Sequence, residues 1–305
     1  MTTAASPSRP RRADVTAAYD LGVDAYAALW SPVILPAAQA VVAALALERG
    51  ARVLDVGAGT GALVPSIQAA AADVTVAGLD ASAEMLRRCR SATGIPAVRG
   101  DALSLPVRDA AVDAVLLAFV PFHLSDPAQA LAEAARVLTC GGSVGTATWA
   151  RDDPMEADEV WEETLTEAGA PPLPARRVDA GLDSQDAIGG LLAGAGLQPV
   201  QIWREPLGHH WELPTYHAFA AGSGRTKQRL QHLGAEQRGE VLDRALIRMP
   251  MGHCAALPCS GFARRASPGD PSVRAHNGSS NSCKLGLNTR PHRAEATTQP
   301  PPRSD

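Results

Sequence analysis

The sequence predicts an α/β protein built on a doubly wound, mostly parallel sheet. Apolar, β-branched runs alternate with alanine- and leucine-rich helical patterns from residue 13 to about residue 249, as expected when helices cross over between buried parallel strands. A glycine-rich turn follows the first of these runs. The 305 residues suffice for one large domain or two small ones, and one enzyme-sized domain is the default expectation.

Six segments have the continuous apolar character of strands that are buried on both faces. They are residues 52–56, 74–79, 97–99, 113–119, 143–149 and 199–203. Helices are expected between them, for example over 128–138, where apolar residues recur at helical spacing behind Asp126 as a cap and Pro127 in the first turn. Gly141 and Gly142 are expected to end that helix.

Composition excludes several classes of function. The formal net charge of −4 gives no electrostatic reason to expect a nucleic-acid or membrane-surface partner. No apolar run is expected to be long enough to cross a bilayer, and no signal peptide is recognisable. The five cysteines form neither a disulfide framework nor a paired zinc motif, so a reducing, cytoplasmic setting is expected.

The last 56 residues, 250–305, differ in composition from the rest of the chain. They hold eight prolines and one aromatic residue, and they show no alternation or helical period. Low hydrophobicity of this kind predicts a disordered, low-complexity tail.

A glycine-rich loop carries the strongest functional signal. Asp55 lies in the first predicted strand, and Gly57, Gly59 and Gly61 follow it before a helix begins. Alternate glycines let the backbone approach a ligand closely, and the free N–H groups at the helix start can bind a carboxylate or phosphate. A nucleotide-like ligand is therefore indicated, although a glycine triplet alone can also be a tight structural turn.

Two further acids end the next two predicted strands. Asp80 lies 21 residues after Gly59, a spacing at which a carboxylate can bind both hydroxyls of a ribose, although it could also cap the following helix. Asp101 ends the third strand. The loop also satisfies the dinucleotide fingerprint, but Asp55 would repel a pyrophosphate and attract a ligand that is cationic at one end.

The order and spacing of four motifs resemble those of class I S-adenosylmethionine-dependent methyltransferases. The motifs are Val53–Gly61, Gly78–Ser82, Gly100–Ala102 and Asp113–Phe119. Residues 122–142 are similar to the helix and turn of the branch that includes quinone-biosynthesis methyltransferases, which usually has proline where Cys140 stands. The resemblance is specific over about residues 19–149, weaker to about residue 248 and absent beyond it.

The resemblance implies a Rossmann-like fold, S-adenosyl-L-methionine as cofactor and methyl transfer to a small-molecule acceptor. It divides the domain, residues 1–249, into an N-terminal helical lid over 1–49, a cofactor-binding core over 50–150 and an acceptor-side region over 151–249. The oligomeric state stays open.

The resemblance also assigns cofactor contacts. Asp55 would orient the methionyl ammonium, Asp80 would bind the ribose diol, and Asp101 would read the adenine amino edge. The other implied contacts are Gly57, Ala58, Gly59 and Gly61 beside the methionyl and ribose portion, Ala81 beside Asp80, Ala102, Met85 and Leu103 around the adenine, Ala118 and Phe119 near the sulfur, and Tyr19 and Tyr26 on the lid.

Methyl transfer needs mainly alignment and exclusion of water, so few dedicated catalytic residues are expected. His123 is the candidate general base, because it follows the fourth strand and imidazole titrates near neutral pH, although such a histidine often only packs. No metal site is expected from His209, His210 and His217. The acceptor pocket is expected among Trp149, Asp152, Trp161, Trp203 and Trp211.

One departure from the family pattern is expected. The family's sheet ends with an antiparallel seventh strand beside the sixth, and no such strand is recognisable after the helix around residues 228–247. Two alternatives therefore stay open. One is a nicotinamide-dependent oxidoreductase, which Asp55 disfavours, and the other is a non-catalytic cofactor-binding module or a truncated, inactive product.

Overall fold

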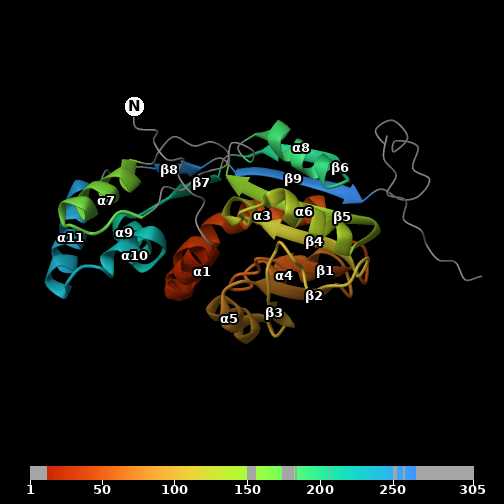
Figure 1. The fold of residues 1–305 in the computed structure, drawn as a ribbon, viewed down its shortest axis with the longest axis horizontal. Helices are drawn as coiled ribbons and strands as arrows, with labels where there is room; N and C mark the ends of the chain where they lie inside the picture. Colours follow the sequence, from red (N-terminus) through yellow and green to blue (C-terminus); the bar gives the residue numbers. More distant parts are fainter. Residues whose placement is uncertain are drawn as a thin grey trace, which may run out of the picture. The chain divides into compact units, whose positions relative to one another are not determined.

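A seven-stranded sheet organises the protein. The computed structural model describes residues 12–149, 156–173, 182, 184–205, 207–249, 253–256 and 258–265. The strand order is β3-β2-β1-β4-β5-β9-β6, and a separate two-stranded sheet pairs β7 with β8 (Figure 1). The strands are β1 (Arg52–Val56), β2 (Thr75–Asp80), β3 (Ala97–Arg99), β4 (Val112–Ala118), β5 (Leu138–Trp149), β6 (Leu197–Arg204), β7 (Leu207–His210), β8 (His253–Ala256) and β9 (Pro258–Arg265).

Helices connect the strands. They are α1 (Arg12–Leu21), α2 (Val23–Ala25), the π-helix η1 (Tyr26–Trp30), α3 (Ser31–Ala44), α4 (Val64–Ala70), α5 (Ala83–Thr93), the 3₁₀-helix η2 (Pro121–His123), α6 (Pro127–Val137), α7 (Glu156–Glu167), α8 (Gln185–Gly194), α9 (Leu213–Gly222), α10 (Gly224–Leu230) and α11 (Ala235–Arg248). Helix α6 begins as the sequence predicts, since the Asp126 side chain accepts a hydrogen bond from the backbone N of Gln129.

Strands β1 to β5 run parallel to one another, which gathers the functional loops at one edge. β1 pairs with β2 on one side and with β4 on the other. The order reverses between β1 and β4, and in sheets of this kind a ligand crevice opens at that point, beyond the carboxyl ends of the strands. The glycine loop, Asp80 and the β4–η2 turn all follow these ends.

Helices cover both faces of the sheet, so the inner strands β1, β2, β4 and β5 are largely buried. The expectation of burial on both faces is wrong for residues 97–99 and 199–203, because β3 and β6 are edge strands whose residues are mostly exposed or half-buried. One core cluster joins the sheet to α3, α4 and α5, with Val41, Ile67 and Leu86 among its buried side chains. The cluster on the other face joins it to α6 and α8, with Leu131 and Leu192. A third cluster unites α7, α9, α10 and α11.

The predicted fold class is confirmed, but the expected absence of the last strand is wrong. β9 is antiparallel and lies between β5 and β6, pairing with both (Figure 1). Its sequence, Pro258-Cys-Ser-Gly-Phe-Ala-Arg-Arg265, has little apolar alternation, so its backbone pairing on both sides defines the strand.

The boundary predicted at residue 249 is also wrong, because β8 and β9 lie within the predicted tail and β9 belongs to the central sheet. Residues 266–305 of that tail lie outside the described residues.

Two smaller expectations need correction. Gly141 and Gly142 do not end α6, which finishes at Val137; β5 begins at Leu138 and runs through both glycines. The judgement that no run reaches membrane-spanning length is also wrong, because Val23–Ala44 is long and apolar enough by length and composition. In the structure α3, which forms most of this run, packs its buried side chains into the core against the sheet.

Candidate cofactor and acceptor site

The glycine loop turns sharply at the end of β1. Gly57 has φ +74°, and its N–H donates to the carbonyl of Leu79 at 2.6 Å. A Cβ atom added at Gly57 would lie 2.2 Å from Cγ2 of Val120. Both the left-handed conformation and the close approach of the β4–η2 turn therefore require glycine at this position.

Asp80 holds the loop against the end of β2. Its carboxylate accepts hydrogen bonds from the backbone N of Gly59 at 2.9 Å and from the backbone N of Ser82 at 2.8 Å. Burial raises the pKa of Asp80, while these N–H donors oppose the rise. The glycine loop and the second acid, placed together by the sequence argument, are in direct contact.

Asp55 is a deeply buried carboxylic acid in the same crevice. Its side chain lines a pocket, the residue is 3% exposed, and none of the described residues donates a hydrogen bond to its carboxylate. Burial, with a smaller contribution from the charge of Asp80, raises the pKa of Asp55 to about 7. The site therefore holds a carboxylate that a cationic group would stabilise.

Six of the predicted cofactor-binding residues line this pocket. They are Tyr26, Asp55, Gly57, Ala58, Ala118 and Phe119. The other lining residues were not predicted, and they are Ser31, Ile34, Leu35, Ala38, Thr60, Ala62 and Leu63. Helix α3 supplies the first four of these, and only the tertiary fold brings that helix to the glycine loop.

The remaining predicted contacts surround Asp80 and the end of β3. Ala81 follows Asp80, and Met85 is 1% exposed at the start of α5, where its backbone N donates to Oγ of Ser82. Gly61 (φ +82°) faces α5, since a Cβ atom there would lie 2.9 Å from Sγ of Cys89.

The third acid shapes its own loop. The backbone N of Leu103 donates to the Asp101 carboxylate at 3.0 Å, and Ala102 between them is buried.

The N-terminal segment contacts the site through two neighbouring side chains of α1. Tyr19 packs edge-on against Tyr26, with ring centroids 5.6 Å apart, and its hydroxyl is 2.8 Å from Nε2 of His123. Asp20 accepts hydrogen bonds from Oγ of Ser82 and from the backbone N of Glu84, at the start of α5. Sequence reasoning missed Asp20, whose role depends on this long-range contact.

His123 lies at the end of η2, the short helix that follows the carboxyl end of β4. Its ring is edge-on to Tyr19 at 5.4 Å and lies 4.0 Å from the ring of Phe122. The ring centroid of Trp149 lies 4.7 Å from that of Phe119 and 6.4 Å from that of Phe122. Two aromatic rings, those of Tyr19 and Phe122, therefore contact the candidate base.

The other candidate acceptor residues are distributed differently. Trp30 stacks on Phe219 and Trp211, which joins the N-terminal helices to the α9 region. Trp161 is buried in the third core cluster, and Asp152 lies outside the described residues. Among the described residues, no group of three or more histidine, cysteine, aspartate or glutamate side chains could hold a metal ion.

Residues 54–145 match the family described as methyltransferase domain. A methyltransferase of Mycobacterium tuberculosis, named as uncharacterized, is 43% identical over 105 residues, which are 33% of this chain and 41% of the relative. A demethylmenaquinone methyltransferase of Deinococcus radiodurans is 42% identical over 96 residues, 30% of this chain and 40% of that protein. The chain thus aligns with less than half the length of either relative.

The fold agrees with these matches. The solved structure of the [4+2]-cyclase SpnF superposes with a TM-score of 0.58 at 19% identity, over 87% of this chain and all of that one. The resemblance to class I methyltransferases is confirmed: residues 54–145 match a methyltransferase domain, and the mostly parallel seven-stranded sheet contains one antiparallel strand, β9.

Proposed function

We propose that this protein transfers a methyl group from S-adenosyl-L-methionine to a small-molecule acceptor. The buried Asp55 carboxylate, without a hydrogen-bond donor among the described residues, is the observation that carries the proposal. It fits the ammonium group of the cofactor, whose positive charge would stabilise the ionised acid. The pyrophosphate of a nicotinamide cofactor would instead be repelled.

The rest of the crevice also fits this cofactor. Asp80 lies at the end of β2 with both carboxylate oxygens turned to backbone N–H groups of the glycine loop and of the α5 start. A ribose diol would bind the same carboxylate as a donor pair. Ala118 and Phe119 close the pocket at the end of β4, where they would exclude water from the reacting atoms.

When bound, the cofactor supplies a methyl group on a positively charged sulfur, which keeps the electron pair of the broken carbon–sulfur bond. The protein aligns the acceptor with that methyl group, an arrangement that can contribute roughly 7 to 11 kcal/mol in well-oriented reactions. His123 receives the proton that the attacking hydroxyl or amine of the acceptor loses. Tyr19, hydrogen-bonded to Nε2 of His123, positions the imidazole.

The side chains around His123 indicate the character of the acceptor. The ring of Phe122 lies beside it, and Trp149 in turn contacts the rings of Phe122 and Phe119. Such surroundings favour a medium-sized, partly apolar or aromatic molecule with one nucleophilic atom.

Calorimetric titration of the full chain with S-adenosylhomocysteine, with NAD as a parallel ligand, tests the proposal. We expect micromolar binding of S-adenosylhomocysteine and none of NAD. Binding of NAD alone, or of neither ligand by a folded protein, would contradict the proposal.

Two variants separate binding from chemistry. Asp80→Ala should weaken S-adenosylhomocysteine binding about 100-fold, because hydrogen bonds to a charged group contribute roughly 1.5 to 3 kcal/mol. His123→Ala should leave that affinity unchanged and abolish turnover once an acceptor is found by a methyl-release screen. Unchanged binding by Asp80→Ala would refute the ribose assignment.

A further inference from the structure

The loop between β3 and β4 is shaped by one face of α6. Residues 101–109 of this loop contain Asp101, which the resemblance to class I methyltransferases assigns to the adenine of the proposed cofactor. Apart from a single β-bridge between Asp101 and Ser104, the loop has no regular secondary structure. Its conformation must therefore depend on side chains that reach it from elsewhere.

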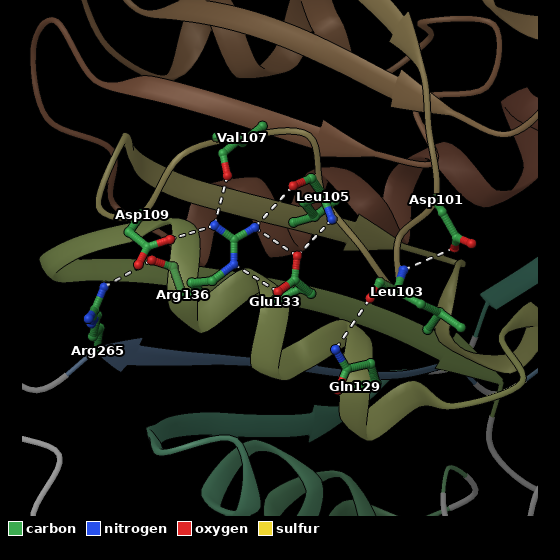
Figure 2. Close-up of polar contacts among 9 residues, drawn as sticks. All are labelled: Asp101, Leu103, Leu105, Val107, Asp109, Gln129, Glu133, Arg136 and Arg265. Atoms are coloured by element: carbon green, nitrogen blue, oxygen red, sulfur yellow. Dashed lines mark hydrogen bonds and ion pairs between the residues drawn. The ribbon is translucent and has the colours of Figure 1, made fainter.

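Three side chains of α6 hold this loop, one helical turn apart (Figure 2). Nε2 of Gln129 donates to the carbonyl of Leu103 at 3.3 Å. Glu133 accepts a hydrogen bond from the backbone N of Leu105 at 2.7 Å. Spacings of four and three residues place Gln129, Glu133 and Arg136 on the same face of the helix.

Arg136 makes the largest number of these contacts. Its guanidinium donates to the carbonyl of Leu105 at 3.0 Å, to the carbonyl of Val107 at 2.8 Å and to the carboxylate of Asp109 at 2.7 Å. The same group donates twice to Glu133, through Nε at 2.8 Å and through a terminal nitrogen at 2.7 Å. The α6 face thus reaches every second residue of the loop from Leu103 to Asp109 (Figure 2).

The geometry distinguishes this network from ordinary surface ion pairs. The side chains of Arg136 and Glu133 are 31% and 15% exposed, and the guanidinium fork makes bidentate contact with the carboxylate. Single exposed pairs contribute little, whereas planar, bidentate networks that also satisfy backbone carbonyls fix a geometry. Hydrogen bonds to Arg136 keep the pKa of Glu133 below its usual range.

The network extends to Asp101. Gln129 holds the carbonyl of Leu103, while the backbone N of Leu103 donates to the carboxylate of Asp101. Both backbone polar groups of Leu103 are therefore held, the carbonyl by α6 and the N–H by Asp101.

We propose that Gln129, Glu133 and Arg136 are positioning residues that shape the 101–109 loop for selective recognition of adenine. This inference rests on the proposed function and assigns a task to side chains that touch neither cofactor nor acceptor.

The last strand supports the same helix. Arg265, at the end of β9, donates to the carbonyls of Arg136 and Leu138 (Figure 2 shows the first). These carbonyls lie at the end of α6, where helical hydrogen-bond acceptors have no partner within the helix. Strand β9, which the sequence analysis did not predict, therefore anchors α6, the helix that holds the 101–109 loop.

The test compares two ligands that differ only in the base. S-inosylhomocysteine carries a carbonyl oxygen where S-adenosylhomocysteine carries the amino group that would donate a hydrogen bond to the Asp101 carboxylate. We expect the unmodified chain to bind S-adenosylhomocysteine 10- to 100-fold more tightly than S-inosylhomocysteine, measured by calorimetry. In Arg136→Met, that ratio should fall to below 5, because the affinity for S-adenosylhomocysteine drops while that for S-inosylhomocysteine stays the same.

The ratio is a readout that a purely structural role would not move. A general loss of stability would weaken the binding of both ligands equally. That result, which leaves the ratio of affinities unchanged, would overturn the proposal. Arg136→Lys, which keeps the charge without the fork, should give an intermediate ratio. Arg49→Met is the matched control, because it removes an exposed arginine ion pair with Asp73, and neither residue belongs to the loop or to α6.

A milder variant covers the case in which Arg136→Met fails to fold. Gln129→Ala removes one exposed contact and should lower the ratio about threefold with an unchanged melting temperature. An unchanged ratio in Gln129→Ala would then overturn the proposal. Failure of the unmodified protein to bind S-adenosylhomocysteine would refute the proposed function, whereas binding without discrimination between the bases refutes this inference alone.

Discussion

The cofactor half of the molecule, β1 to β4 with their helices, differs from the half that contains β5 to β9 in how its structure is specified. In the first half, parallel strands are flanked by short-range signals, such as the glycine loop and the capped α6. In the second half, β9 depends on pairing with β5 and β6, each remote in sequence. Local signals therefore identify a site, while long-range pairing completes the sheet that supports it.

Arg229 illustrates the same difference. It is fully buried, and its guanidinium donates to the carbonyls of Ala170 and Pro171 and to the carboxylate of Glu162. These acceptors lie in α7 and directly after it, about 60 residues earlier in the chain. A single arginine on a short helix carries no local signal for such a role.

Removal of the last strand is expected to have the largest effect. A chain that ends at residue 249 would leave β5 and β6 without their shared partner, an exposed pair of edges in a protein whose total stability is about 5 to 15 kcal/mol. We expect loss of the cooperative thermal transition, measured by circular dichroism. A chain that ends at residue 267 is the control and should melt like the full chain; a folded 1–249 product would show that β9 is dispensable.

Gly57→Ala, in the cofactor half, should lower the free energy of unfolding by about 2 to 4 kcal/mol. The substitution combines a positive φ with a Cβ atom 2.2 Å from Val120, and strain and overpacking each contribute roughly 1 to 3 kcal/mol. Denaturant unfolding measures the loss. Gly50→Ala is a matched control, because Gly50 has φ +75° with nothing within 4 Å of the added Cβ. Equal losses in the two variants would mean that contact with Val120 is unimportant.

The pH dependence of ligand binding should depend on Asp55. Its pKa of about 7 means that the free protein is protonated there below pH 7, and an ammonium ligand must displace that proton. S-adenosylhomocysteine affinity should therefore fall about tenfold per pH unit below 7 and level off above pH 8. Asp55→Asn should bind weakly with a flat profile. A slope that persists in Asp55→Asn would assign the effect to another group, such as Asp80, whose charge acts on Asp55.

The same shift makes a prediction about stability without ligand. Because the folded pKa of Asp55 lies above the ordinary value of 3.8, its stabilising contribution is present below about pH 4 and is lost as the pH rises through 7. The difference in melting temperature between the unmodified protein and Asp55→Asn should therefore shift against the unmodified protein between pH 5 and pH 8. An unchanged difference would contradict the raised pKa.

The smallest effects are expected at the two edges of the sheet. Val98 on β3 and Val200 on β6 are 50% and 51% exposed. Exchange of either for threonine should change the free energy of unfolding by less than about 0.5 kcal/mol, measured by urea titration. A larger loss at Val200 alone would show that the β6 edge is covered.

Much of the cofactor half was predictable. The strand at residues 52–56 was predicted with its observed bounds, and the contact between the glycine loop and Asp80 follows from strand order at a parallel sheet edge. The α3 residues of the pocket and Asp20 were not predictable, because nothing near them in the sequence indicates which distant loop they meet.

The sequence by itself determined the alternation of buried strands and helices, the positive-φ glycine turn and the acids that follow consecutive strands. These features follow from local periodicity, from backbone sterics and from side-chain chemistry. Only the tertiary structure decided that residues 258–265 form a central strand, that Tyr19 meets His123, and that α6 shapes the 101–109 loop. Each of these depends on groups remote in sequence, whose contacts become favourable only when the whole sheet brings them together.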